Sequence, residues 1–414
     1  MNSLNYLKSI LKTLNQQELN SLEKFVLYQG GKDEVGVSKT TQLIKLVLDS
    51  GNFSSIDIQK TIYGKLNYSA FNKLANRLKE RILEVILFNS SIRSSNYAER
   101  SKTIFELRKR MIQVDLLILK GVRSKVIDEL NLIIKKADDY EIYDVLIQAL
   151  YTKQRTQSFD MGLKRFEKHK MQIKLAEEKW IAFNSAQLIF NIIVSKIGAV
   201  TKPELYKIEL QEALLQLNER YRKTYAPTVG YYYHLLQVEY FQLEKDYLKA
   251  DVQLKELVKL VENSKSVYSD FRIGSVKMNL ANNCIFLKDF ESAILNIEDA
   301  KHYFRNQAVN LTILKEIELY VYFYLGELSI CNQLSEDLIL ESRKVNSPLV
   351  SSKIIYLSAS IDFVMSEFSK ALIRLDECEE IDKDKEGWNI IKKIMILICR
   401  IELGEFESVD LKLG

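Results

Sequence analysis

The chain has 414 residues, of which 47% are hydrophobic and 28% are charged, and its formal net charge is +4. It contains only 14 glycines and 3 prolines, about a third of the combined share of roughly 12% that is usual in proteins. This shortage excludes collagen-like, linker-like and disordered chains, and it disfavours sheet-rich folds, which need both residues at their turns. We therefore expect an all-α protein that is long enough to bury a large core.

The small net charge conceals an asymmetry along the chain. Residues 1–125 contain 21 Lys and Arg against 11 Asp and Glu, whereas the remainder contains 38 against 44. The first part therefore carries a net charge of +10 and the second part a net charge of −6. Such a difference indicates that the two parts of the chain have different partners.

The ends of the chain and its cysteines predict a cytoplasmic protein. The first residues lack the basic and apolar segments of a signal peptide, and the apolar run Ile394–Cys399 has six residues, where a membrane span needs about 20. The cysteines have no paired spacing and lie in apolar stretches, so neither disulfides nor a zinc site is expected. They are Cys284, Cys331, Cys378 and Cys399. We expect no membrane association.

In chain order, apolar spacing first predicts a basic helical unit over residues 1–105. Its helices are expected near residues 40–49, 56–63 and 69–88, with a turn at Gly64–Tyr68 between the last two. The helix at 69–88 places apolar residues three and four apart on one face. These residues are Phe71, Leu74, Ala75, Leu78, Ile82 and Val85.

Basic residues in this region suggest a nucleic-acid interface. Lys73, Arg77 and Arg81 recur every four residues, opposite the apolar face of the predicted helix. A second basic cluster, Arg108, Lys109 and Arg110, follows further along the chain. Three helices that end in such a helix have the outline of a helix-turn-helix, whose last helix enters the major groove of DNA.

Other features of the same helix favour an ordinary amphipathic helix with a solvated charged face. The helix is about 20 residues long, Glu80 and Glu84 flank the basic stripe, and no wing-like hairpin follows. Both interpretations stay open.

Residues 106–228 continue the helical spacing, and Gly121…Val126 has the form of one degenerate hairpin turn. From residue 229 a short pattern recurs: an acidic residue, an aromatic residue or leucine, and a small or branched residue three positions later. The copies are Asp246-Tyr247…Ala250, Asp289-Phe290…Ala293, Glu327-Leu328…Cys331, Glu367-Phe368…Ala371 and Glu405-Phe406…Val409. They are spaced 43, 38, 40 and 38 residues apart. Each copy predicts a helix hairpin, because the acidic residue suits the N-terminus of the second helix and the small residue permits close packing.

These hairpins resemble the tetratricopeptide repeat (TPR) family. The best matches are LANNCIFLKDFESAILNIEDA at 280–300 and SASIDFVMSEFSKALIRLDEC at 358–378. The period here exceeds the 34 residues of the family, and the proline between units is missing. The resemblance covers residues 229–414 well and 110–225 by analogy, and it implies a right-handed superhelix of hairpins with a concave groove that binds a peptide or protein.

A cluster of tyrosines at the start of the clearer repeats could anchor such a ligand. Tyr232 and Tyr233, with Tyr231 beside them, precede Tyr240 by two helical turns. Tyrosine buries a large area at a low entropy cost, which suits recognition. The alternative is that these rings fill the core between helices.

No pattern of residues indicates catalysis. The histidines His169, His234 and His302 lie 65 or more residues apart, and no metal-binding or nucleophilic spacing accompanies them. We therefore expect neither cofactor nor metal, and we expect a non-catalytic scaffold that binds a protein or peptide. The alternative function is a regulator that binds nucleic acid through its basic head and senses a ligand through its TPR-like repeats.

Overall fold

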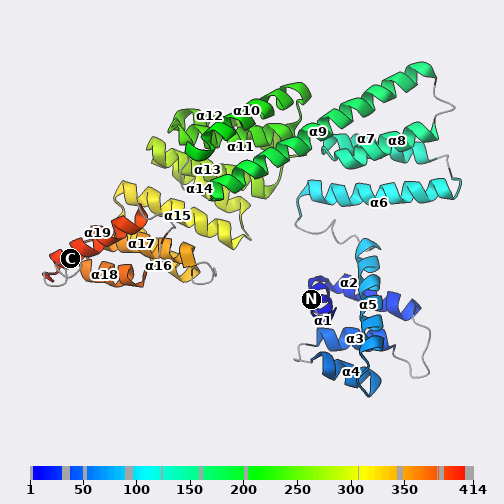
Figure 1. Cartoon of the computed structure of the whole chain (residues 1–414), viewed down its shortest axis with the longest axis horizontal. Helices are drawn as coiled ribbons and strands as arrows, with labels where there is room; N and C mark the ends of the chain where they lie inside the picture. The colour runs from blue at the N-terminus through cyan, green and yellow to red at the C-terminus, as the bar shows by residue number, and fades with distance from the viewer. Residues whose placement is uncertain are drawn as a thin grey trace. The chain divides into compact units, whose positions relative to one another are not determined.

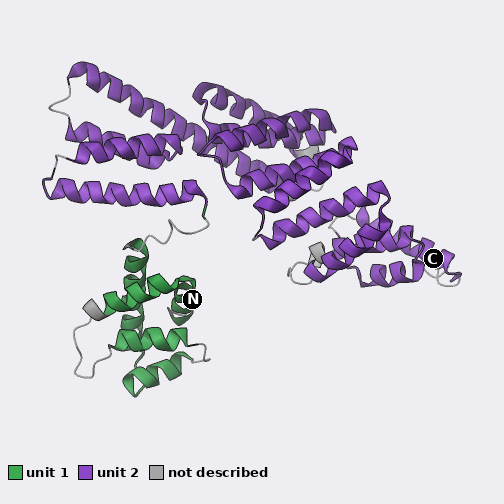
Figure 2. Ribbon diagram, turned by 180° about the vertical axis from the view of Figure 1, so that it is seen from behind, with its two compact units in different colours: residues 1–97 green, residues 98–414 purple. Residues whose placement is uncertain are grey.

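The computed structural model of the chain describes residues 3–29, 38–49, 54–88, 97–122, 125–157, 162–199, 204–305, 307–342, 348–379, 381 and 387–405. Within these ranges the regular elements are helices and none is a strand (Figure 1). The predicted all-α fold is confirmed. Contacts between residues divide the chain into two compact units, Met1–Tyr97 and Ala98–Gly414 (Figure 2).

The division between the units differs from the predicted boundary at residues 105 and 106. Those residues lie inside one continuous helix, α6 (Glu99–Leu119), which packs against α7 (Val126–Asp139) and α8 (Tyr143–Thr156) of the second unit. Arg108, Lys109 and Arg110 therefore belong to the second unit. The first 97 residues contain 13 Lys and Arg against 8 Asp and Glu. Their net charge is therefore +5, half of the +10 carried by residues 1–125.

The first unit packs its described helices around one apolar core. The helices are α1 (Ser3–Thr13), α2 (Gln16–Gln29), α3 (Lys39–Leu48), α4 (Ser55–Tyr63) and α5 (Tyr68–Phe88). The three helices predicted in this region appear as α3, α4 and α5. The apolar face predicted for the last of them is buried from Phe71 to Val85, against α1, α2 and α3.

Side-chain caps fix where several of these helices begin. The side chains of Asn15 and Glu18 each accept a hydrogen bond from the other residue's backbone N–H, both at 2.9 Å, before α2. Ser54 and Asp57 make the same reciprocal pair at the start of α4. Both pairs satisfy donors that a helix N-terminus leaves unpaired.

In the second unit each helix packs against the next along the chain, from α6 to α19. The helices after α8 are α9 (Leu163–Ala199), α10 (Glu204–Thr224), α11 (Pro227–Leu243), α12 (Tyr247–Asn263), α13 (Asp270–Leu287), α14 (Phe290–Tyr303), α15 (Ala308–Leu325), α16 (Leu328–Ser342), α17 (Pro348–Val364), α18 (Phe368–Glu377) and α19 (Trp388–Glu402). This sequential packing is that of a repeat solenoid. It confirms the predicted TPR-like array of hairpins.

The five predicted hairpin turns share one backbone conformation. The residue before each acidic residue has a positive φ angle, and the acidic residue's N–H donates to the carbonyl five residues earlier. The residues with positive φ are Lys245, Lys288, Gly326, Ser366 and Gly404. This arrangement is the Schellman motif that ends helices. The sequence pattern therefore marks the end of each first helix.

The capping role predicted for the acidic residue is present at Asp246 and Asp289, whereas Glu367 makes no side-chain cap hydrogen bond. The side chains of Asp246 and Asp289 each accept a hydrogen bond from the backbone N–H three residues later, at 3.1 Å. The small residues are fully buried between helices: Ala250, Ala293, Cys331 and Ala371. Val409, the corresponding residue of the last copy, lies outside the described residues.

The buried carboxylate of Glu141 links the turn between α7 and α8 to the start of α11. Glu141, between α7 and α8, accepts hydrogen bonds from the Tyr143 hydroxyl at 2.6 Å and from the backbone N–H of Thr228 at 2.9 Å. Thr228 lies in the first turn of α11, so the carboxylate meets the positive end of that helix. Arg100 of α6 donates to the carbonyls of Tyr140 and Glu141 at 3.0 Å.

Helix α9 differs from the sequence expectation about membranes. Within the described part of the chain, its stretch Leu163–Ile197 is the one helix long and apolar enough to cross a membrane, and 17% of its apolar window is buried. Polar residues such as Asn184 and Asn191 interrupt the apolar sequence of α9. The length of uninterrupted apolar runs therefore does not identify this helix. Here the helix packs against α8, α10 and α11.

Candidate functional site

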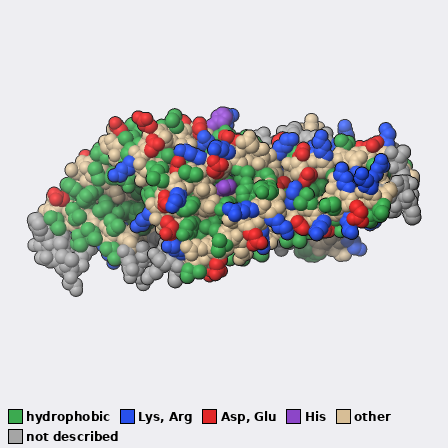
Figure 3. All heavy atoms as spheres, turned by 90° about the horizontal axis from the view of Figure 1, so that it is seen from above, with side chains coloured by type: hydrophobic (Ala, Val, Ile, Leu, Met, Phe, Trp, Pro, Cys, Tyr) green, Lys and Arg blue, Asp and Glu red, His purple; other side chains and the backbone are tan. Residues whose placement is uncertain are grey.

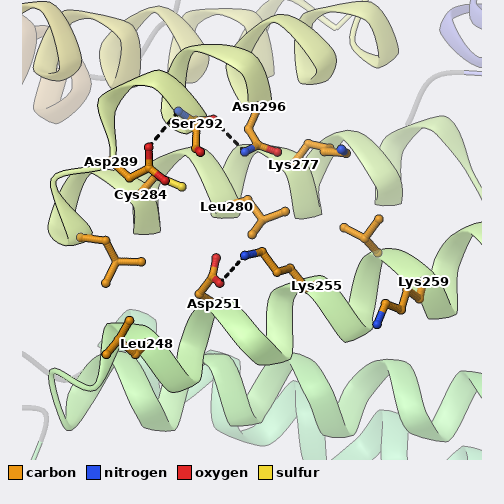
Figure 4. Close-up of a pocket in the computed structure, with 12 residues that line it drawn as sticks. Leu248, Asp251, Lys255, Lys259, Lys277, Leu280, Cys284, Asp289, Ser292 and Asn296 are labelled. Carbon is orange, nitrogen blue, oxygen red and sulfur yellow. Dashed lines mark hydrogen bonds and ion pairs between the residues drawn. The ribbon is translucent and has the colours of Figure 1, made fainter.

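A groove of about 700 Å³ lies over α13, between α12 and α14 (Figure 4). Helix α13 packs against both of the other helices, so the two second helices of neighbouring hairpins form the walls. The groove is lined by Leu248, Asp251, Lys255, Val258, Lys259, Lys277, Leu280, Cys284, Leu287, Asp289, Ser292 and Asn296.

The floor of the groove is apolar. Leu280 and Cys284, one helical turn apart on α13, are nearly buried and face the opening. Burial raises the pKa of Cys284 to about 11, so its side chain is a neutral thiol near pH 7. At one end the side chain of Leu248 is exposed over 71% of its surface. Exposed leucine beside a concave floor favours contact with an apolar partner group.

The rim of the groove is charged, and its charges are locally paired. Each lysine of the lining forms an ion pair with an acidic residue nearby. The pairs are Lys255 Nζ with Asp251 Oδ2 at 2.7 Å, Lys259 Nζ with Glu256 Oε1 at 2.8 Å, and Lys277 Nζ with Asp299 Oδ2 at 3.0 Å. The hydrogen bond to Asp251 raises the pKa of Lys255. A partner would therefore contact an apolar floor surrounded by ion pairs, whose opposite charges largely cancel each other's electric field.

The wider surface has the same mixed character. On the face shown in Figure 3, Lys and Arg side chains are interspersed with Asp and Glu, and hydrophobic side chains are exposed among them. Long-range attraction of a strongly charged ligand to this face is therefore weak.

The predicted tyrosines lie outside this groove. Tyr232, Tyr233 and Tyr240 are half-buried and pack against the core formed by α9, α10 and α11. The Tyr232 ring lies 5.0 Å from that of Phe190, and the Tyr240 hydroxyl accepts a hydrogen bond from Gln211 Nε2 at 3.1 Å. These contacts favour the alternative in which the rings fill the space between helices.

The three histidines are not brought together. His169 Nε2 is 2.8 Å from the carbonyl oxygen of Leu150, and His234 Nδ1 is 2.9 Å from Gln253 Oε1. His302 lies beside Arg305. Over the described ranges, no group of three or more His, Cys, Asp and Glu side chains is placed to hold a metal ion.

The basic residues predicted for nucleic acid fall into two separate groups. Lys73 and Arg77 are exposed on α5 of the first unit, and Arg81 is half-buried on its flank. On α6, in the second unit, Arg108 forms an ion pair with Asp144 at 2.8 Å, and Arg110 forms one with Glu129 at 2.8 Å. Lys109 also has an interaction partner. Arg108 and Arg110 therefore link α6 to α8 and α7 of their own unit.

The groove residues were not predicted from the sequence, because the predicted binding residues lie on the first helices of the hairpins. A signal was present in α12, where Leu248, Asp251, Lys255 and Val258 recur at intervals of three and four. That spacing marks a helix face of its own, distinct from the buried face at Ala250, Leu254, Leu257 and Val261.

No protein-family model and no curated protein matches the chain. Among solved structures, it is similar to a signal transduction ATPase with numerous domains (STAND) protein with a tetratricopeptide repeat sensor from Pyrococcus horikoshii. The two are 10% identical with a TM-score of 0.46, and the match covers 99% of this chain and 64% of that chain. The chain thus spans less than two thirds of that protein's length.

Proposed function

We propose that the chain is a non-catalytic cytoplasmic scaffold that binds a protein or peptide segment in the groove between α12, α13 and α14. The observation that carries the proposal is the groove itself, in which an apolar floor and an exposed leucine are surrounded by paired charges. Helical-repeat solenoids bind extended partners on such surfaces, because stacked hairpins present a continuous and rigid face.

The mechanism requires only binding. An apolar side chain of the partner covers Leu248 and Leu280, while the ion pairs on the rim exchange hydrogen bonds with the partner's backbone and polar groups. The Cys284 thiol contributes packing and no nucleophile, since burial raises its pKa to about 11. We assign neither cofactor nor metal to this activity.

The experiment is a selection of random displayed peptides against the full chain, followed by calorimetric titration of the enriched peptides. Leu248→Asp is expected to weaken binding by about tenfold or more, since burying a leucine stabilises a complex by roughly 1.5–3 kcal/mol. Leu295→Asp is the matched control, because Leu295 on α14 is 68% exposed and does not line the groove. Equal loss in both variants, or no enriched peptide, contradicts the proposal.

Salt dependence gives a second readout. Because every lysine of the rim already has an acidic partner, binding of a neutral peptide is expected to change little between low and moderate salt. A steep fall in affinity with salt would contradict an apolar mode of recognition.

A further inference from the structure

We propose that α4, the turn after it and α5 form a helix-turn-helix that binds duplex DNA, with the N-terminal half of α5 in the major groove. This site lies in the first unit and does not depend on the proposed peptide groove. The alternative function given above is nucleic-acid binding by the basic N-terminal unit. The present proposal adds which part of α5 contacts the bases.

The turn has the length and the geometry that this motif needs. Residues 64–67 connect the two helices, and Gly64 has a φ of 70°, a conformation that favours glycine. A turn of three to four residues that often contains glycine joins the helices of a helix-turn-helix. In Figure 1, α5 runs across the direction of α3 and α4.

Side chains hold the two helices in one mutual orientation. The fully buried Gln59 of α4 accepts a hydrogen bond from the backbone N–H of Asn67 at 3.2 Å. The Asn67 side chain accepts one from the N–H of Ala70 at 3.0 Å, and the Tyr63 hydroxyl donates to the Ala70 carbonyl at 3.1 Å. The first turn of α5 is therefore fixed relative to α4, as base recognition requires.

The outward face of that half-helix carries side chains that recognise bases and phosphates. Ser69, Asn72, Lys73, Asn76 and Arg77 are exposed and follow one another at intervals of three and one, opposite the buried apolar face. Asparagine pairs with adenine through two hydrogen bonds, and arginine pairs with guanine in the same manner. An α-helix about 10–12 Å across fits a major groove about 12 Å wide.

The acidic residues of α5 do not interrupt this face. Glu80 and Glu84 follow the whole polar stripe, next to the exposed Leu83 and Leu87. In the motif the N-terminal residues of the recognition helix contact base edges, so the second half of a long helix can leave the groove. The length of α5 and the presence of Glu80 and Glu84 favoured an ordinary amphipathic helix. Both are compatible with DNA binding by the N-terminal half of α5.

Further cations border the stripe. Lys39 at the start of α3 lies 5.1 Å from the centre of the Tyr63 ring, and Lys60 and Lys65 are exposed on α4 and in the turn. Burial raises the pKa of Tyr63, and the positive charge of Arg77 opposes that rise. Exposed cations on the elements next to a recognition helix suit contacts with the phosphate backbone of a duplex.

The test measures binding of the full chain to a mixed-sequence DNA duplex by fluorescence anisotropy, from about 50 to 300 mM salt. Replacing Lys73 and Arg77 by alanine is expected to lower affinity by about tenfold or more and to reduce the slope of log K against log salt by about 2, since each phosphate contact contributes roughly 0.9. The matched control replaces Lys12 and Lys24, exposed lysines on α1 and α2, and is expected to retain the wild-type affinity.

Sequence recognition is tested separately by selection from random duplexes. The wild type is expected to enrich one motif, and Asn76→Ala is expected to lose about tenfold of the preference for it while keeping non-specific binding. If the alanine pair lowers the melting temperature, Lys73→Gln with Arg77→Gln removes the charges at similar side-chain length.

Three results would overturn this proposal: no duplex binding at about 50 mM salt, equal affinity of the Lys73/Arg77 and Lys12/Lys24 variants, or a preference for single-stranded RNA or a protein over duplex DNA. Leu248→Asp, which tests the peptide groove, is expected to leave DNA binding unchanged. Failure of one site is thereby distinguished from failure of the other.

Discussion

At the scale of single residues, the close packing of the hairpins depends on glycine as well as on alanine. A Cβ atom built on Gly274 of α13 would lie 2.9 Å from Cε1 of Phe304 and 3.0 Å from Cβ of Tyr303. The Phe304 ring is fully buried, so it has no solvent-filled space to move into. The backbone of α13 therefore approaches the end of α14 more closely than any side chain permits.

Gly274→Ala is expected to destabilise the protein. Overpacking costs about 1–3 kcal/mol, and the better helix propensity of alanine returns at most about 1 kcal/mol. Chemical denaturation measures the difference, with the adjacent Ser275→Ala as a control that is expected to stay within about 0.5 kcal/mol. A Gly274→Ala protein as stable as the wild type would show that the two helices can move apart.

At the scale of elements, the turn between α13 and α14 has a lysine at a position where the backbone conformation favours glycine. Lys288 adopts a φ of 58° immediately before the capping residue Asp289, and this conformation costs a residue with a Cβ about 1–2 kcal/mol. Gly326 and Gly404 occupy the same place in later turns.

Lys288→Gly is therefore expected to stabilise the protein by about 0.5–1 kcal/mol, since the relief of strain exceeds the entropy that glycine gains in the unfolded chain. Thermal unfolding measures the effect. Lys288→Ala is the control and is expected to bring no gain, because alanine retains the Cβ. If Lys288→Ala stabilised the protein as much as Lys288→Gly, the positive φ angle would not be the reason for the gain in stability.

The cap that follows this turn makes stability depend on pH. Hydrogen bonds from Ser292 lower the pKa of Asp289 below its ordinary value of 3.8. Its stabilising contribution is thus fully present above about pH 4 and is lost as the pH falls through the lowered pKa. Asp289→Ala is expected to cost about 1 kcal/mol at pH 7 and less near pH 2, as measured by denaturation at each pH. A cost that is independent of pH would contradict the role of the carboxylate.

At the scale of the whole molecule, the division into two units predicts two unfolding transitions. Leu43 is fully buried in the core of the first unit, and a Leu→Ala change in such a place costs about 2–5 kcal/mol. Leu43→Ala is expected to lower the melting temperature of one calorimetric transition and to leave the other unchanged. A shift of all transitions together would show that the units unfold as one.

Across the whole molecule, the hairpins were predictable from the sequence and the groove was not. Asp246, Asp289 and the small residues after them predicted the hairpins, because capping and close packing act locally. The groove was not predictable in the same way, since it depends on how α12 and α14 are spaced across α13. Tyr232 and Tyr240 illustrate the limit, because periodicity alone does not separate a groove ring from a core ring.

The central claim is that the groove between α12, α13 and α14 binds a peptide segment. The most direct measurement replaces Leu248, and in a second protein Leu295, with a photoreactive amino acid and irradiates each with a selected peptide. Both positions are similarly exposed, at 71% and 68%. We expect crosslinking at position 248 that excess unlabelled peptide abolishes, and none above background at position 295. Equal crosslinking at both positions, or crosslinking at position 295 alone, would contradict the claim.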